Sequence, residues 1–160
     1  DARFNGPEIQ FYGDGKIRLG ERSYIGRNSR IESSQGCTVN IGSCCAMSHY
    51  IYINTVNRMA DQDFSDSFES FDIRKGDVRI GDYCWIGAYV FVVEGASIGE
   101  NSVIGAHSVV TKDLPPHSIC TGAPAKVIKF KSYLGEEEKR DLAESYRERL
   151  SDDLRDELLS

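Results

Sequence analysis

The stretch Ile80–Val110 reads IGDYCW IGAYVF VVEGAS IGENSV IGAHSV V, and its spacing decides the fold of this 160-residue chain. An aliphatic residue opens each group of six, and a small or β-branched residue follows four places later. A period of six is out of phase with the 3.6 residues of a helical turn, and recurrent Gly opposes helix formation. A hairpin meander needs longer alternating runs between its turns. The spacing therefore predicts a chain wound into flat faces with these residues inward, as in parallel β-helices.

Two further motifs resemble a known family, the hexapeptide-repeat acyltransferases that fold as left-handed β-helices. Residues 109–130, VVTKDLPPHSICTGAPAKVIKF, are similar to the segment that closes the coil in the sugar and xenobiotic O-acetyltransferase branch. CWIG at residues 84–87 resembles the tryptophan-bearing turn of that branch. The resemblance implies an all-β fold, a left-handed parallel β-helix with an extruded loop and a C-terminal α-helix. Left-handed winding rests on the resemblance alone, because the spacing does not indicate a hand.

The expected organisation is one β-helix domain over residues 1–131 and a C-terminal helical extension over residues 132–160. Residues 1–16 are expected to form a short strand or an irregular first coil. Hexads run from Leu19, pause after Ile31, and resume from Ile41 to Ile53. A bulge or small loop in the pause would restore the register.

An extruded loop is expected at residues 54–79, where the six-residue period is absent and Asp and Ser are frequent. Loops of this length in compact domains are usually functional, and a disordered surface insertion is the alternative. The resemblance implies that this loop reaches over a site of a neighbouring subunit.

The tail from Glu136 carries an apolar stripe at helical spacing, which predicts a helix that docks on the β-helix or on the same helix in sister chains. The stripe consists of Leu142, Tyr146, Leu150, Leu154 and Leu158.

The formal net charge of −6 argues against binding of nucleic acid or an anionic membrane, and no apolar run is long enough to span a bilayer. The five cysteines lack CxxC spacing, so neither a disulfide framework nor a zinc site is expected. Cys45 and Cys84 occupy inward positions of their hexads and are predicted to be buried thiols. Reduced cysteines and the lack of a secretory signal favour the cytoplasm. Because Asp1 stands where Met would, either processing or the chosen boundary of the sequence is expected to have removed what preceded it.

Acyl transfer from a thioester needs a general base, an oxyanion donor and a groove for the carrier, and histidine suits the first role. His49, in MSHYIYI, is predicted to point outward at a corner of the coil, shortly before the long loop. The resemblance implies catalysis here, because nucleotide-sugar N-acyltransferases of this fold carry their base at this corner. Tyr50 stands where that motif has an acid or amide, and a surface histidine that caps a turn is the alternative.

Four acidic residues are candidates for orienting His49, namely Asp61, Asp63, Asp66 and Glu32. In the O-acetyltransferase branch the histidine lies near Asn57 or Arg58, and the loop of this chain has none. Either the base has moved to His49 or the protein is a poor enzyme. His107 is interpreted as structural, and His117, after two prolines, as solvent-exposed. The three histidines lack the close pair of related zinc enzymes, so no metal site is expected.

Acetyl-CoA is the implied co-substrate. By the resemblance, Thr111 and Lys112 match coenzyme contacts, Lys129 contributes its charge, and Ala88 and Ala106 contribute backbone groups. Lysines at the end of a groove suit the phosphates of coenzyme A. The backbone N–H of Ala88 is the expected oxyanion donor.

The expected acceptor contacts are Trp85, Tyr50, Asn54 and Asn57. Trp85 projects outward from the coil, where the family places its equivalent beside the pocket, and packing between subunits is the alternative. The outward aromatic residues Tyr52, Tyr89 and Phe91 suit intersubunit packing better than sugar stacking.

These inferences predict a homotrimeric, acetyl-CoA-dependent O-acetyltransferase of a saccharide hydroxyl, acting by direct attack with His49 as general base. The resemblance implies sites between subunits, with His49 and the loop from one chain and the coenzyme groove partly from another. One alternative is N-acetylation of a nucleotide-linked amino sugar. The other is a non-catalytic trimer that serves as a scaffold or binding protein.

Overall fold

Three sheets, parallel except for one antiparallel pair at the C-terminal end of the coil, form the faces of a β-helical coil in the computed structural model, which describes residues 1–65 and 71–159. The five-stranded sheet contains β2 (Gln10–Tyr12), β5 (Arg30–Glu32), β8 (Tyr52–Ile53), β13 (Phe91–Val92) and β16 (Val109–Val110). The four-stranded sheet contains β3 (Lys16–Leu19), β6 (Thr38–Ile41), β11 (Val78–Ile80) and β14 (Ser97–Ile98). The seven-stranded sheet contains β1 (Arg3–Asn5), β4 (Tyr24–Gly26), β7 (Ala46–Met47), β12 (Trp85–Ile86), β15 (Val103–Ile104), β17 (Ser118–Gly122) and β18 (Ala125–Phe130).

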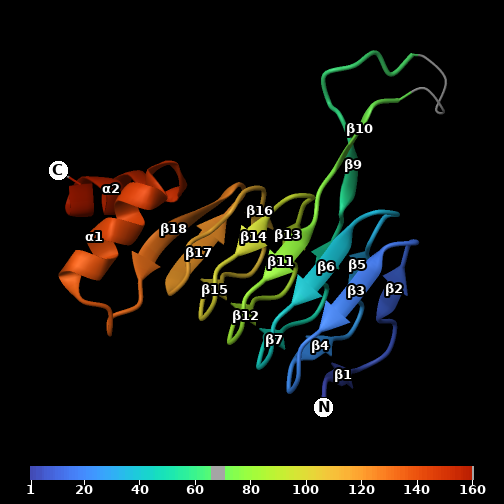
Figure 1. The fold of residues 1–160 in the computed structure, drawn as a ribbon, viewed down its shortest axis with the longest axis horizontal. Helices are drawn as coiled ribbons and strands as arrows, with labels where there is room; N and C mark the ends of the chain where they lie inside the picture. Colours follow the sequence, from blue (N-terminus) through green and yellow to red (C-terminus); the bar gives the residue numbers. More distant parts are fainter. Residues whose placement is uncertain (66–70, 160) are drawn as a thin grey trace.

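The chain visits the four-stranded, seven-stranded and five-stranded sheets in rotation, and we call one such passage a rung. Rungs stack along the long axis of the molecule (Figure 1). Strands of successive rungs pair in parallel, for example Ile86 with Met47 on one side and with Ile104 on the other. This topology confirms the predicted all-β, parallel architecture, with flat faces and short strands.

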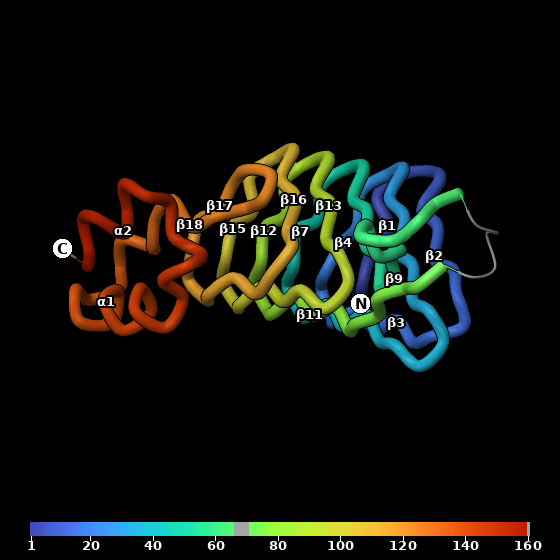
Figure 2. Tube along the Cα trace, turned by 90° about the horizontal axis from the view of Figure 1, so that it is seen from above, coloured from blue at the N-terminus to red at the C-terminus, as the bar shows by residue number. Residues whose placement is uncertain are grey.

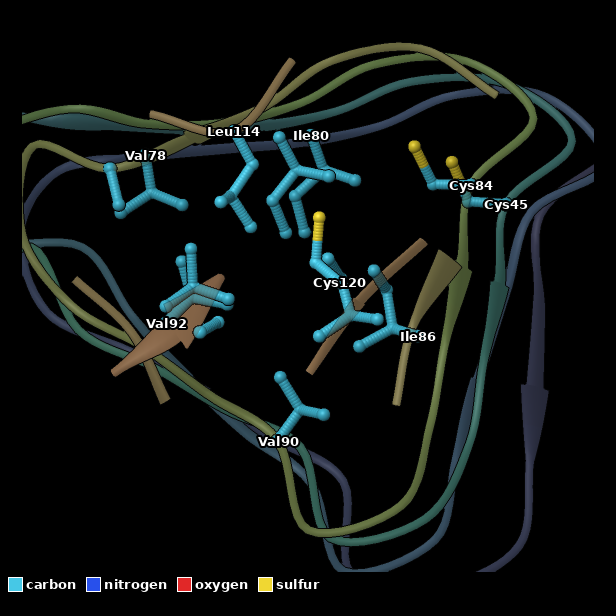
Figure 3. Close-up of a cluster of buried hydrophobic side chains, with 14 of the residues drawn as sticks. Cys45, Val78, Ile80, Cys84, Ile86, Val90, Val92, Leu114 and Cys120 are labelled. Carbon is cyan, nitrogen blue, oxygen red and sulfur yellow. The ribbon is translucent and has the colours of Figure 1, made fainter. Parts of the chain in front are cut away.

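The inward residues of the hexads stack into columns that fill the coil. In the seven-stranded sheet Ile25, Met47, Ile86 and Ile104 follow one another in register and are buried. Figure 3 shows Ile80, Ile86 and Val92 pointing from different faces into the same interior. Because each such side chain contributes about 1.5–3 kcal/mol when removed from water, the columns are the main source of stability.

The corners between faces are tight, and many of them place a residue in the left-handed backbone region. Tyr50, Tyr89 and His107 occupy equivalent corners in three rungs, with φ values of 59°, 59° and 60°. Adjacent rungs also approach closely at the hexad glycines. A β-carbon on Gly87 would lie 2.6 Å from the backbone nitrogen of Ala106, so a side chain there would push the rungs apart.

The predicted loop leaves the coil after β8 and returns at β11. Its two arms pair as an antiparallel hairpin, β9 (Val56–Arg58) with β10 (Ile73–Lys75), and we call these two strands the excursion stem. The stem projects away from the coil (Figure 1). The coil continues across the insertion, because Val78 on β11 pairs with Val39 on β6.

The C-terminal segment differs from the prediction of a single helix. It forms α1 (Glu136–Ser145), a 3₁₀ turn (Arg147–Arg149) and α2 (Asp152–Leu159), with Leu150 extended between them. Ser151 donates its N–H to the carbonyl of Val127 at 2.8 Å, and Leu150 and Leu154 are buried. The break lets both helices lie at the end of the coil beside β18 (Figure 2). Leu142, Leu150, Leu154 and Leu158 of the predicted apolar stripe pack in the core there.

Residues 1–16 form the first rung, in which β1 and β2 pair in parallel with β4 and β5. Their side chains are exposed, including Phe4 and Phe11. Within the described ranges, no helix is both long and apolar enough to cross a membrane.

Candidate functional site

Two corners of the coil, on either side of the five-stranded sheet, hold most of the predicted site residues. The aromatic edge joins the seven-stranded to the five-stranded sheet and contains Arg27–Asn28, His49–Tyr50, Ala88–Tyr89 and Ala106–His107 in successive rungs. The excursion edge joins the five-stranded to the four-stranded sheet and contains 33–37, 54–65, 71–77, 93–95 and 111–113.

His49 lies exposed on the aromatic edge, as the hexad spacing predicts for a corner residue. Its imidazole lies over Gly26 of the preceding rung, where a β-carbon would collide with Nδ1 of His49. Its carbonyl accepts the N–H of Tyr89 at 3.1 Å, which fixes the backbone of this corner. Within residues 1–65 and 71–159, the imidazole has no hydrogen-bond partner. The ring is therefore positioned by backbone geometry and remains open to an incoming group.

The acidic residues considered as partners of His49 are engaged elsewhere or lie away from it. Glu32 is buried and accepts hydrogen bonds from the backbone and hydroxyl of Thr55 at 2.8 and 3.0 Å. Asp63 accepts the N–H of Ser65, and Asp61 is exposed in the excursion. Asp66 lies outside the described residues. Glu32 instead fixes the start of the excursion, because it binds both the backbone N–H and the hydroxyl of Thr55.

Tyr50 packs along the aromatic edge. Its ring stacks on Tyr89 with a centroid distance of 4.5 Å, and Tyr89 stacks on His107 at 4.9 Å. This column gives His107 a packing role, in agreement with its interpretation as structural. It also holds Tyr50 beside His49 by aromatic contact.

The predicted coenzyme residues are divided between the two edges. Ala88 and Ala106 share the aromatic edge with His49 and stand one position before its left-handed corner residues. Thr111 and Lys112 are exposed on the excursion edge. Lys129 is exposed on β18 and pairs with Ile119. One chain therefore does not gather these groups at a single point.

Trp85 lies on the outer face of the seven-stranded sheet, between Ala46 and Val103 of neighbouring rungs, and is 56% exposed. Asn54 and Asn57 lie on the excursion edge, at the start of the excursion. His49 and the start of the excursion leave the coil at different edges. The five-stranded sheet separates the two edges, because β8 lies between His49 and the excursion.

The excursion edge also carries a polar cluster that the hexad pattern does not predict. The side chain of Glu94 is 2% exposed, and its Oε1 lies 2.6 Å from Nε of Arg74. Its Oε2 accepts a hydrogen bond from Nδ2 of Asn57. Burial raises the pKa of Glu94, but hydrogen bonds from Asn57 and Arg74 outweigh burial and leave that pKa below its usual value. The carboxylate is therefore charged at neutral pH and ties both arms of the stem to the coil.

A cleft of about 440 Å³ opens beside this cluster. Its walls combine two guanidinium groups, one carboxylate, an amide, a hydroxyl and two apolar side chains. The lining residues are Asn57, Arg58, Arg74, Phe91, Val93, Glu94 and Thr111. The sequence offered a weak signal, because Glu94 is an acid within the apolar run VFVVEGA.

His117 was predicted to be solvent-exposed, and its side chain is partly exposed, at 26%. Its Nδ1 lies 3.0 Å from the hydroxyl of Tyr133, and its Nε2 lies 3.7 Å from Glu100. The C-terminal segment supplies Tyr133, which the hexad pattern gives no means to place. Within the described ranges no group of three His, Cys, Asp or Glu residues could hold a metal ion.

Four of the five cysteines are buried, and Cys44 is a partly exposed corner residue with a φ of 57°. Cys45 and Cys84 stack in successive rungs at the corner opposite the five-stranded sheet, and both are buried as predicted (Figure 3). The hydrogen bond with Cys45 and burial raise the pKa of Cys84, and burial raises the pKa of Cys120 to about 11. The thiols of Cys84 and Cys120 are therefore protonated at neutral pH and have no role as nucleophiles in the candidate site.

Comparison with known proteins places this geometry in a family. A family model described as bacterial transferase hexapeptide (six repeats) matches residues 77–112. The galactoside O-acetyltransferase of Escherichia coli K12 is 31% identical over 123 residues, which cover 77% of this chain and 58% of that protein.

Solved structures of acetyltransferases are also similar to this chain. A galactoside acetyltransferase in complex with coenzyme A has a TM-score of 0.68 and 30% identity, covering 81% of this chain and 64% of that one. A maltose O-acetyltransferase from Clostridium difficile 630 has a TM-score of 0.63 and 30% identity, covering 81% of this chain and 71% of that one. The chain spans between 28% and 58% of the length of eight curated relatives. The chain therefore belongs to the hexapeptide-repeat transferase family.

Proposed function

We propose that this protein is an acetyl-CoA-dependent O-acetyltransferase that acts on a saccharide hydroxyl, with a left-handed coil and His49 as general base. The observation that carries the proposal is the position of His49. Its exposed imidazole shares the aromatic edge with Ala88 and Ala106, whose backbone groups match coenzyme contacts in the family. The relatives named for galactoside and maltose O-acetyl transfer support the reaction class, and one of them is a complex with coenzyme A.

The proposed reaction is a direct transfer. The imidazole of His49 removes the proton of the acceptor hydroxyl as its oxygen attacks the thioester carbonyl carbon. The resulting oxyanion accepts a hydrogen bond from a backbone N–H, for which Ala88 is the candidate. The tetrahedral intermediate then expels the thiolate of coenzyme A, which takes the proton from the imidazolium. The products are an acetyl ester and free coenzyme A.

The site is proposed to lie between subunits of a homotrimer. Within one chain the five-stranded sheet separates His49 from the excursion stem. An aromatic edge that faces the excursion edge of a neighbouring chain would bring His49 together with Asn57, Thr111 and Lys112. Trp85, outside the seven-stranded sheet near the aromatic edge, would then border the acceptor. Reduced thiols favour a cytoplasmic enzyme.

The decisive experiment measures release of free thiol from acetyl-CoA with a panel of neutral sugars, sugar acids, sugar phosphates, amino sugars and nucleotide-sugars. His49→Ala is expected to lower kcat by about 10²- to 10⁴-fold while the far-ultraviolet circular dichroism stays unchanged. His117→Ala is the matched control, because His117 is hydrogen-bonded to Tyr133 away from both edges. Equal activity of the His49 variant and wild type would exclude the general base.

A non-catalytic trimer is the second candidate. It is favoured by the lack of a hydrogen-bond partner for the His49 imidazole among described residues. It is also favoured by the lack of a histidine near Asn57 or Arg58, where the resemblance places the histidine of O-acetyltransferases. A scaffold would release no thiol with any acceptor. Thiol release with amino sugars alone would replace O-transfer by N-acetylation.

A further inference from the structure

Arg74 lines the cleft on the excursion edge. One nitrogen of its guanidinium is bound to a carboxylate, and the rest of the group is exposed. Arg74 and Asn57 stand opposite each other on β10 and β9, and the buried carboxylate of Glu94 accepts a hydrogen bond from each. Only Nε of Arg74 takes part, at 2.6 Å from Oε1 of Glu94, and the side chain of Arg74 is 69% exposed. The guanidinium plane is therefore fixed while its two outer nitrogens face solvent.

This arrangement is typical of a preorganised anion-binding group. The outer nitrogens of a guanidinium form a planar fork of N–H donors that matches a carboxylate or phosphate through two parallel hydrogen bonds. Holding Nε on a buried acid lowers the entropy lost when that fork engages a ligand. Among the described residues, the structure gives Arg74 no partner for those outer donors.

The rest of the cleft has the character of a site for a charged sugar. Phe91 and Val93 form an apolar wall on which the C–H face of a sugar ring can pack. Thr111, an expected coenzyme contact, lines the same cleft, so an acceptor bound there would lie beside the coenzyme. Arg58 adds a second guanidinium to the lining, and its Cζ lies 4.8 Å from the ring centroid of Phe71.

We infer that the acceptor is an anionic saccharide whose carboxylate or phosphate binds the outer nitrogens of Arg74. Glu94 acts as a positioning residue that fixes Arg74 and keeps Asn57 at the wall of the cleft. This inference rests on the proposed acetyl transfer, since it names the class of acceptor for the same site. Binding of the anionic saccharide can be measured in the absence of acetyl transfer.

The test compares galactose with galacturonate and galactose 6-phosphate, in a binding titration by calorimetry and in the thiol-release assay. Wild type is expected to bind at least one anionic sugar about 10- to 100-fold more tightly than galactose. Arg74→Gln is expected to abolish that preference and raise KM for the anionic acceptor, with KM for acetyl-CoA unchanged. Arg74→Lys keeps the charge but not the fork, and should restore part of the preference.

Arg79→Gln is the matched control, because Arg79 is an exposed arginine on β11 and does not line the cleft. It should leave the preference intact, and thermal melts check that every variant is folded. Equal binding of galactose and both anionic sugars by wild type would overturn the inference. So would an Arg74→Gln variant that raises KM for acetyl-CoA alone, because the guanidinium would then bind a phosphate of the coenzyme. Selective binding of an anionic sugar without thiol release would support the anion site and reject the proposed activity.

Discussion

Different kinds of contact stabilise the coil interior and the excursion stem. In the interior, aliphatic side chains repeat in register from rung to rung, as in the column of Met47, Ile86 and Ile104. In the stem, two short strands carry mostly exposed side chains and are tied to the coil through the carboxylate of Glu94. The difference shows that this fold separates a scaffold stabilised by apolar burial from a site shaped by a few buried polar contacts.

The largest expected effect comes from truncating the interior. Ile86→Ala should lower the free energy of unfolding by about 2–5 kcal/mol, because Ile86 is fully buried between two neighbouring rungs. Urea denaturation followed by circular dichroism measures the change. The same truncation in the stem, Ile73→Ala, is the control, since Ile73 is 50% exposed and should lose less than about 0.5 kcal/mol. Equal losses at both sites would remove the distinction between the two regions.

An intermediate effect is expected from neutralising the carboxylate that ties the stem. The pKa of Glu94 lies below its usual value of 4.5, so the charged form contributes stability above that pH, and this contribution is lost as pH falls through the folded-state pKa. Glu94→Gln should therefore lower unfolding free energy by about 1–3 kcal/mol at pH 7, with a smaller difference from wild type below pH 4.5. Thermal melts at a series of pH values measure this difference.

Glu144→Gln provides the control for that series, because Glu144 is exposed on α1. Its stability difference from wild type should stay small throughout. A Glu94→Gln variant that is equally destabilised at pH 7 and pH 3 would point to lost packing rather than lost charge.

The smallest expected effect concerns the aromatic edge. His107→Ala removes the ring that stacks on Tyr89 at 4.9 Å and should cost about 0.5–1.5 kcal/mol. Chemical denaturation is again the measurement, and His107→Phe should recover most of the loss because it restores a flat ring. If His107→Phe were no more stable than His107→Ala, stacking would not be the source of the contribution.

The six-residue period was sufficient to predict the coil because each position in a hexad always points either into the coil or out of it. Cys84 and Ile86 were predicted inward and Trp85 outward from spacing alone, and all three predictions are confirmed. The period also placed His49 at an exposed corner. Its catalytic role remains a prediction.

The remaining features depend on contacts between segments that share no period. Glu94 and Arg74 are 20 residues apart, and one of them lies in the segment where the repeat stops. His117 meets Tyr133 from the C-terminal segment, and the apolar stripe of the tail bends at Leu150 to reach Val127. The hexad pattern predicts only whether a residue points into or out of its own rung. It therefore cannot predict contacts between residues of different segments.

The pairing of Val78 with Val39 means that the insertion enters and leaves the coil without displacing the rungs on either side. The entropic cost of closing a loop grows slowly with its length, so this position tolerates large changes in size. Changes in length and sequence can therefore accumulate between β9 and β10 while the scaffold stays constant. The same position suits protein engineering, where a foreign peptide grafted between Arg58 and Ile73 would be displayed on a rigid, repetitive body.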